Sequence, residues 1–133
     1  MKLTHTIAAT FLIAGSAFAF MALAQEKSAL TRTDLVQNEI SAPGLEVVQA
    51  RVDFAPGAVS IKHSHPGEEV AYVLKGSIEY QLEGKPPVTL KTGESLFIPA
   101  GAAHVAKNVG DGEASELATY VVKTDLPLVV MEK

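Results

Sequence analysis

Seven glycines recur at nearly even intervals from residue 57 onward, and their spacing limits what this chain can fold into. The steps between them are 10, 9, 8, 9, 8 and 9 residues. Regular turn residues between short β-rich runs are typical of antiparallel sandwiches and barrels, and they leave no room for long helices. The glycines are Gly57, Gly67, Gly76, Gly84, Gly93, Gly101 and Gly110. We therefore predict an all-β domain.

The runs between these glycines have the periodicity of half-buried strands. Apolar and polar residues alternate through Glu46–Phe54, and Ser77–Leu82 shows the same period of two. Four further short runs are Val70–Leu74, Ser95–Ile98, Val105–Val109 and Leu117–Val122. Together the runs predict about seven strands.

The first 24 residues have the composition of an export signal. Lys2 supplies a positive start, Ile7–Phe20 is largely apolar, and residues 22–24 read Ala-Leu-Ala, which a signal peptidase can cleave. We expect cleavage after Ala24, with Ala19 as the alternative site. An uncleaved membrane anchor is the competing interpretation, because the apolar span is close to the ~18 residues that a membrane crossing needs. In either case we expect an exported domain, periplasmic or secreted, with no stable membrane association once the signal is removed.

The rest of the chain has the size of one domain. After the signal we expect an N-terminal arm or edge strand over residues 25–44, a barrel over 45–125 and a C-terminal tail over 126–133. The absence of cysteine excludes disulfides and thiolate chemistry. A formal charge of -4, with no run of Lys or Arg, excludes the electrostatic footprint of a nucleic-acid-binding protein.

Two short segments carry three of the four histidines. Side chains two residues apart on a strand point the same way, so His63 and His65 share a face. Glu69 follows a turn at Pro66–Gly67 that can return its carboxylate to the same point, and His104 can close the set from another hairpin. Three imidazoles and one carboxylate suit one divalent transition metal ion: Fe, Mn, Co, Ni, Cu or Zn. A lone His-x-His pair is more often a pair of polar strand residues without a metal. The spacing of the surrounding residues therefore decides whether these histidines are metal ligands.

That spacing resembles the two sequence motifs of the cupin superfamily. Both motifs are complete, and 16 residues separate them, which is typical of small bacterial single-domain cupins. The resemblance covers about Val47–Val122. The matching residues are Gly57, His63, His65, Glu69 and Gly76 in the first motif and Gly93, Pro99, Gly101, His104 and Asn108 in the second.

The resemblance implies a small antiparallel jelly-roll β-barrel of six to eight strands, usually a homodimer. It also implies a metal ion held by His63, His65, Glu69 and His104. By analogy with cupins that act on flavonol or oxalate, Glu69 is a candidate catalytic base. We expect Asn108 to be structural, because its side chain readily bonds nearby main chain.

Strand parity predicts the lining of the interior. Ile61 shares a face with His63, Ala71 with Glu69, and Ala106 with His104. Val73, Asn108, Ala50, Val52, Phe54, Ile78 and Tyr80 are expected to point inward as well, and Glu68 to face solvent. By the same count the cations Arg51, Lys62 and Lys75 face outward. The interior is therefore predicted to be small and apolar, without a charge partner for a strongly anionic substrate such as oxalate or a sugar nucleotide.

Two classes of function follow. The first is a metal-dependent enzyme, an oxygenase or related Lewis-acid catalyst acting on a small enolisable or aromatic molecule. The second is a noncatalytic module that binds a metal or small ligand outside the cytoplasm. We favour the enzyme, because closed structural metal sites rarely use a mixed ligand set inside a cavity.

Overall fold

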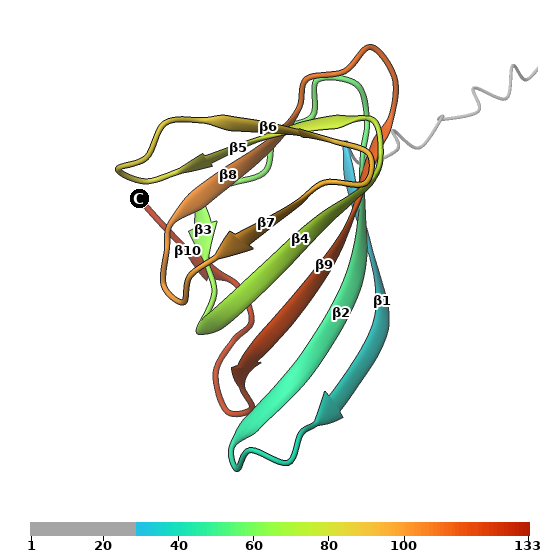
Figure 1. The fold of residues 1–133 in the computed structure, drawn as a ribbon. Coiled ribbons are helices and arrows are strands. Elements are labelled where there is room, and N and C mark those ends of the chain that lie inside the picture. The colour runs from blue at the N-terminus through green and yellow to red at the C-terminus, as the bar shows by residue number, and fades with distance from the viewer. Residues whose placement is uncertain (1–28) are drawn as a thin grey trace, which may run out of the picture.

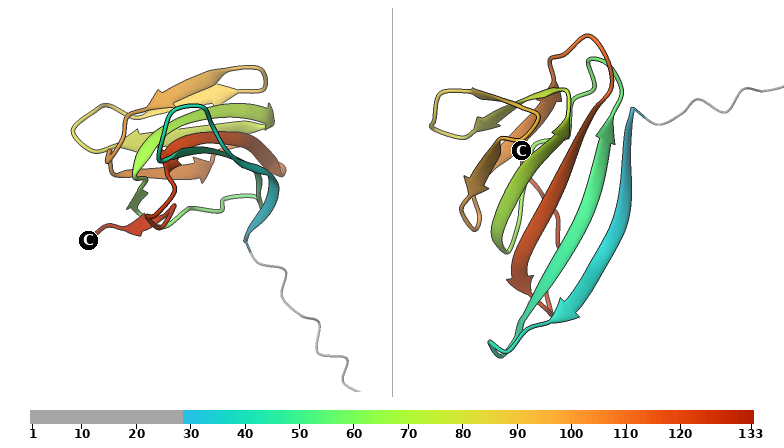
Figure 2. Two further views of the ribbon diagram at one scale, coloured as in Figure 1. Left: turned by 90° about the horizontal axis from the view of Figure 1, so that it is seen from below. Right: turned by 45° about the vertical axis from the view of Figure 1, so that its right-hand side comes forward.

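The computed structural model describes residues 29–133, which form ten strands in two facing sheets (Figure 1). The strands are β1 (Leu30–Glu39), β2 (Leu45–Phe54), β3 (His63–Ser64), β4 (Gly67–Lys75), β5 (Ser77–Leu82), β6 (Val88–Lys91), β7 (Ser95–Ile98), β8 (His104–Asn108), β9 (Ala114–Lys123) and β10 (Val130–Met131). The first sheet has the order β1-β2-β9-β4-β7 and the second β10-β3-β8-β5-β6. In Figure 2 the long strands of the first sheet form a curved wall opposite the shorter strands of the second.

This topology confirms the predicted all-β jelly-roll barrel. Consecutive strands β3 and β4 lie in different sheets, and β4 pairs with the distant strands β9 and β7. Two of the predicted runs match β5 and β7 to the residue, and the other four fall on β2, β4, β8 and β9. Residues 30–39 form an edge strand, and the tail includes β10, which pairs with β3. The predicted signal lies outside the described residues.

No helix within residues 29–133 is long and apolar enough to cross a membrane.

The alternation of side chains along β4 divides the strand between the interior and the outside. Glu69, Ala71 and Val73 are buried, whereas Glu68 and Val70 are exposed. The same parity buries Ala50, Phe54, Ile78, Tyr80, Ala106 and Asn108, as predicted. The buried apolar residues form one cluster around Phe54, Ile78 and Tyr80, and a smaller one of Val48, Ala118, Tyr120 and Val122. Both clusters contribute to the lining of the pocket described below.

The turn between β4 and β5 depends on Gly76. Its φ is 78°, in the left-handed region that side chains with a Cβ rarely adopt. A Cβ there would also lie 3.0 Å from the Cβ of Ala114. Glycine at this position therefore lets the chain leave the first sheet and enter the second within one residue.

Asn108 joins three segments of the barrel, which confirms its predicted structural role. Its amide nitrogen lies 3.0 Å from the carbonyl oxygen of Ala55, 2.8 Å from that of Gly112 and 3.3 Å from that of Phe54. Its Oδ1 accepts a hydrogen bond from the backbone N–H of Gly110. Asn108 is 1% exposed, so its own amide depends on these backbone groups for hydrogen bonds.

We predict that Asn108→Ala lowers the free energy of unfolding by about 3 kcal/mol, because it leaves buried backbone groups without partners. Urea denaturation followed by circular dichroism measures the change. Asn38→Ala, on the exposed edge strand β1, is the matched control and should change stability little. Equal effects of the two substitutions would contradict this role for Asn108.

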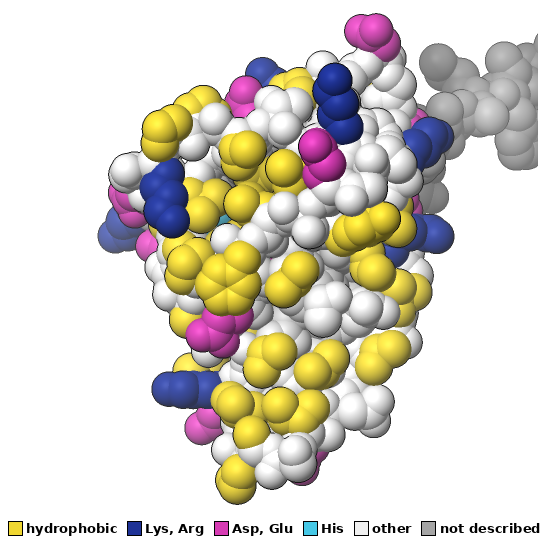
Figure 3. Space-filling view, in the orientation of Figure 1, with side chains coloured by type: hydrophobic (Ala, Val, Ile, Leu, Met, Phe, Trp, Pro, Cys, Tyr) yellow, Lys and Arg dark blue, Asp and Glu magenta, His cyan; other side chains and the backbone are white. Residues whose placement is uncertain are grey.

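The outer face of the first sheet carries an apolar patch, which we define as Val70, Tyr72, Leu74 and Phe97. These side chains are 40–58% exposed. Val70 stands opposite Phe97 in the pairing of β4 with β7. In Figure 3 apolar side chains gather on this face of the molecule. Part of the outer face of the first sheet is thus apolar.

Candidate metal centre

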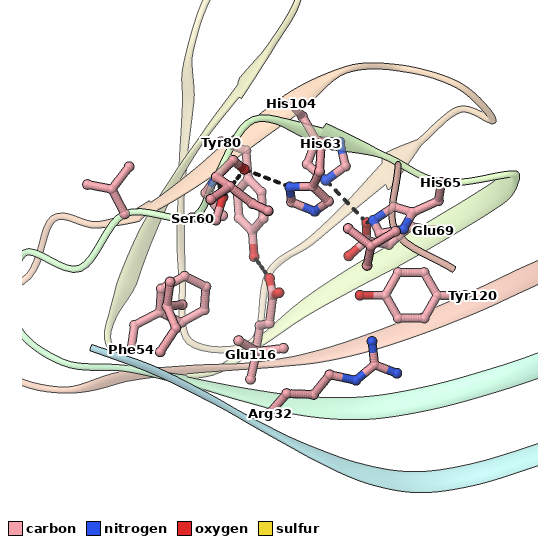
Figure 4. A pocket seen from close by; sticks show the side chains of 16 residues that line it. Arg32, Phe54, Ser60, His63, His65, Glu69, Tyr80, His104, Glu116 and Tyr120 are labelled. Atoms are coloured by element: carbon pink, nitrogen blue, oxygen red, sulfur yellow. Dashed lines mark hydrogen bonds and ion pairs between the residues drawn. The ribbon is translucent and has the colours of Figure 1, made fainter. Parts of the chain in front are cut away.

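The two sheets contribute different members of the predicted ligand set. His63 belongs to β3 and stands opposite His104, the first residue of β8. His65 lies just beyond β3, and the chain then turns through Pro66 into β4. Glu69 is the third residue of β4 and points inward from the first sheet. The structure therefore brings all four predicted residues together where the sheets face each other (Figure 4).

The four side chains converge on one small region. One ring nitrogen from each of His63, His65 and His104 lies within 4.8 Å of the other two. The Oε2 of Glu69 is 3.1 Å from Nε2 of His65 and 3.4 Å from Nε2 of His104. His65, Glu69 and His104 are each 3% exposed, and His63 is partly exposed. The site is thus buried at one end and accessible at His63.

A backbone carbonyl orients each imidazole. The Nδ1 atoms of His63, His65 and His104 lie 2.8, 2.6 and 2.9 Å from the carbonyl oxygens of Ile61, Leu128 and Ala102, respectively. An N–H at Nδ1 that donates to a carbonyl leaves the lone pair on Nε2. The neutral rings therefore have the tautomer in which Nε2 can bind a cation.

The donor set fits a metal ion. The Nε2 of His65 and the Oε2 of Glu69 are both buried, and neither has a hydrogen-bond partner within residues 29–133. A lone pair and a carboxylate oxygen 3.1 Å apart repel each other unless positive charge lies between or beside them. A divalent transition metal accepts three imidazoles and one carboxylate, whereas Ca²⁺ and Mg²⁺ prefer oxygen ligands.

Protons are the alternative source of positive charge at this cluster. Burial opposes ionisation of Glu69, but contacts from His104 and His65 outweigh it and lower the pKa of Glu69 to about 2. Burial likewise favours neutral His104, but Glu69 and the carbonyl of Ala102 overcome it and raise the pKa of His104. Burial lowers the pKa of His63. The carboxylate of Glu69 thus stays charged near neutral pH, and a proton on His104 competes with a metal ion.

We predict that metal affinity falls as the pH drops from about 7 to about 5, roughly tenfold per pH unit for each imidazole that becomes protonated. The carboxylate of Glu69 adds nothing to this dependence, because its pKa of about 2 lies below the range. Competition between the protein and a chromophoric chelator measures the affinity of Zn²⁺ at each pH. An affinity that stays constant across the range would contradict binding through imidazoles.

A cavity of about 350 Å³ lies over the cluster (Figure 4). Its walls combine apolar side chains with a few polar ones. The lining residues are Leu30, Arg32, Val52, Phe54, Val59, Ser60, Ile61, His63, His65, Glu69, Tyr80, His104, Ala106, Glu116, Tyr120 and Val129. Ile61 and Val52 line it as predicted, although Ile61 is 52% exposed. The cavity has the size of a small-molecule site.

The prediction of an apolar interior without cations is wrong in one respect, because Arg32 lines the cavity. Arg32 lies on β1 opposite Val52 of β2, and its Nε donates to Asp34 at 2.7 Å. The alternation of Leu30 and Arg32 could have revealed its direction. The expectation of an arm or edge strand over residues 25–44 assigns no inward face to that segment.

Glu116 also lines the cavity and was not predicted. It is 5% exposed and stands opposite Val52 on β2 and Val73 on β4. The predicted strand began one residue later, at Leu117, although Ala118 and Tyr120 share the inward face of Glu116. Extending the strand by one residue would have found it. The carbonyl of Leu128, which orients His65, carries no sequence signal.

A jelly-roll barrel with three imidazoles and a carboxylate converging inside it defines a small barrel protein of the cupin type. Residues 50–120 match the model of the Cupin domain. The chain therefore belongs to the cupin family.

Plant proteins are among the curated relatives. A germin-like protein, subfamily 2 member 2, of Arabidopsis thaliana is 38% identical over 89 residues, which cover 59% of this chain and 39% of the relative. Oxalate oxidase GF-2.8 of Triticum aestivum is 34% identical over 104 residues, which cover 70% of this chain and 45% of the relative. The chain thus spans less than half the length of these relatives.

Solved structures share the fold. A cupin-like protein of Thermotoga maritima is 29% identical with a TM-score of 0.64, covering 77% of this chain and 75% of that one. An oxalate oxidase in complex with glycolate is 27% identical with a TM-score of 0.62, covering 77% of this chain and 55% of that one.

Proposed function

We propose that this cupin is an exported, metal-dependent enzyme that acts on a small molecule able to offer two oxygen atoms to a metal. The observation that carries the proposal is the meeting of four inward-directed donor groups at the base of a cavity. Three imidazole nitrogens and the Glu69 carboxylate are the proposed ligands. When bound, a divalent ion such as Fe, Mn, Co, Ni, Cu or Zn would supply Lewis acidity and leave positions for substrate oxygens.

The walls of the cavity select the rest of the substrate. Val52, Phe54 and Ala106 offer apolar contact to an enolisable or aromatic body. Tyr120 packs against His65, with ring centroids 4.6 Å apart, and shields that side of the cluster from water. The substrate class is thus a small enol, diketone or catechol-like molecule.

Arg32 extends this class to small carboxylates. An anionic substrate needs a cationic side chain in the cavity, and Arg32 provides one. Its side chain is 36% exposed and already paired with Asp34, so its attraction for a substrate anion is weakened. An oxalate oxidase of similar fold has been solved with glycolate, a small hydroxy acid. We therefore include glycolate and oxalate among the candidate substrates.

The export part of the proposal is supported by the apolar segment Ile7–Phe20 and the Ala-Leu-Ala sequence at residues 22–24. Amino-terminal sequencing of the protein recovered from the exported compartment tests it. A mature chain that begins at Gln25, or at residue 20 for the alternative site, is the expected result.

We predict that Glu69→Gln lowers metal affinity at least about tenfold, because an amide replaces a charged ligand. Glu68→Gln is the matched control: it makes the same chemical change on the exposed face of the same strand and should leave metal affinity unchanged. Elemental analysis of the purified variants measures the bound metal. Equal metal contents would contradict the assignment of Glu69 as a ligand.

Turnover separates the enzyme from a noncatalytic binding module. We predict oxygen consumption or product formation by the metal-loaded protein with at least one of catechol, a flavonol, a 1,3-diketone, glycolate or oxalate. Removal of the metal with a chelator should reduce the rate to that of the buffer alone. Stoichiometric, tightly retained metal with no turnover of any of these compounds would favour the noncatalytic module.

We also propose that the apolar patch on the first sheet joins two copies of the chain in a homodimer. Burial of an exposed apolar face removes it from water, and a two-fold axis lets the same patch serve both copies. We predict that Phe97→Glu gives a monomer in analytical ultracentrifugation, whereas Val109→Glu, at an exposed site outside the patch, leaves a dimer. A monomeric wild type would contradict this proposal.

A further inference from the structure

Glu116 is a buried carboxyl group that the proposed ligand set does not use. It lies on β9 and is 5% exposed. No ion pair within residues 29–133 involves it, although five other carboxylates there pair with cationic or imidazole side chains. A buried carboxylate without a cationic partner is costly, so its neutral form is favoured. Glu116 therefore differs from Glu69, which is in contact with two imidazoles.

Tyr80 fixes the direction of the Glu116 carboxyl group. Tyr80 is 1% exposed and lies on β5, in the sheet opposite β9. Its hydroxyl donates a hydrogen bond to Oε2 of Glu116 across the interior. In Figure 4 the carboxyl group of Glu116 points from the first sheet toward Tyr80 and the imidazoles. Both residues line the cavity, so a molecule bound over the cluster lies beside them.

We propose that Glu116 is a second acid–base residue of this pocket, which exchanges a proton with the molecule bound at the His63, His65, Glu69 and His104 cluster, and that Tyr80 positions it. This inference rests on the proposed function of the cluster. It assigns different roles to the two inward carboxyl groups of the cavity. Glu69 supplies a permanent negative charge, and Glu116 accepts and returns a proton.

The proton transfer is balanced without any further reactant. The ionised carboxylate of Glu116 takes the proton of an enol or catechol O–H. The electron pair of the broken O–H bond stays on the oxygen of the bound molecule, which becomes an anion facing the cationic centre. Glu116 becomes a neutral carboxylic acid, and the reverse transfer protonates the product. A group that donates and accepts in this way works best when its pKa lies near the working pH.

The surroundings of Glu116 meet that condition. Burial and the charge of Glu69 raise the pKa of Glu116 to about 7, against the opposing effects of the Tyr80 hydroxyl and His104. The titratable or charged side chains that face the same cavity come from six strands and one loop. They are Arg32 on β1, His63 on β3, Glu69 on β4, Tyr80 on β5, His104 on β8 and Tyr120 on β9, with His65 between β3 and β4.

The test counts protons when 4-nitrocatechol binds to the metal-loaded protein. Isothermal titration calorimetry in buffers of different ionisation enthalpy gives the number of protons released to solvent for each probe molecule bound. We expect wild type to release fewer protons than Glu116→Gln, by up to one per probe, in part of the range between about pH 6 and 9. Glu116→Gln keeps an acceptor for the Tyr80 hydroxyl, so we expect it to fold and to retain its metal.

Two further variants separate positioning from simple packing. Tyr80→Phe removes a hydrogen bond that lowers the pKa of Glu116. Tyr80→Phe and the double variant Tyr80→Phe/Glu116→Gln should therefore differ in the number of protons released over a higher pH range than wild type and Glu116→Gln do. Tyr72→Phe makes the same change on an exposed tyrosine of β4. It should not shift the pH range in which Glu116→Gln changes the number of protons released.

Each outcome decides a different claim. Equal proton counts for wild type and Glu116→Gln, with equal metal content and probe affinity, would overturn the acid–base role alone. Loss of metal from a folded Glu116→Gln would also overturn it, because Glu116 would then support the cluster. A wild-type protein that holds no metal would refute the proposed function, and the inference that rests on it would fail as well. A metal-loaded wild type that does not bind 4-nitrocatechol would overturn the inference alone, because no O–H group would then reach Glu116.

Discussion

Imidazole lone pairs and the negatively charged carboxylate of Glu69 meet at one buried point of this barrel. These groups repel one another, and the rest of the structure holds them together. The carbonyls of Ile61, Leu128 and Ala102 accept hydrogen bonds from the Nδ1 atoms of the three imidazoles. These bonds fix the ring orientations, so that the Nε2 lone pairs stay directed at the centre of the cluster. Glu69 adds a negative charge that is 3% exposed. Such a cluster is stable only when protons or a metal ion supply positive charge.

The barrel holds these groups in place through contacts made elsewhere. Asn108 ties β8 to the loops that follow β2 and precede β9, and so fixes the strand that carries His104. The backbone N–H of Gly101 donates to the carbonyl of His65 and links the two loops that flank the site. Members of both apolar clusters line the pocket. The free energy of apolar burial thus helps to hold the donor atoms together against their mutual repulsion.

The pocket gives its two inward carboxyl groups opposite properties. Glu69 touches two imidazoles, which hold its pKa at about 2. Glu116 accepts a hydrogen bond from the Tyr80 hydroxyl, and burial together with the charge of Glu69 raises its pKa to about 7. The surroundings of Glu69 favour its charged form, whereas those of Glu116 allow it to exchange a proton near neutral pH. This asymmetry is the physical basis for assigning a ligand role to the first and an acid–base role to the second.

The sequence predicted most of the fold, because glycine spacing and strand parity are local signals. Parity placed Ala71, Ala106 and Asn108 in the interior, and the His-x-His pair indicated where a cluster would form. Arg32 and Glu116 were missed for a different reason. Arg32 lies in a segment expected only to be an arm or edge strand, which assigns its side chains no inward face, and Glu116 lies just before the predicted start of β9. The Tyr80–Glu116 hydrogen bond joins strands from opposite sheets, and no local pattern announces such a contact.

X-ray absorption spectroscopy of the metal in the natively purified protein tests the central claim most directly. The account predicts a first shell dominated by imidazole nitrogen, with three rings and one carboxylate oxygen at about 2.0–2.2 Å for zinc. His63→Ala should lower the imidazole count by one or release the metal. A shell of water and carboxylate oxygens with fewer than two imidazoles, or a spectrum unchanged by His63→Ala, would contradict it.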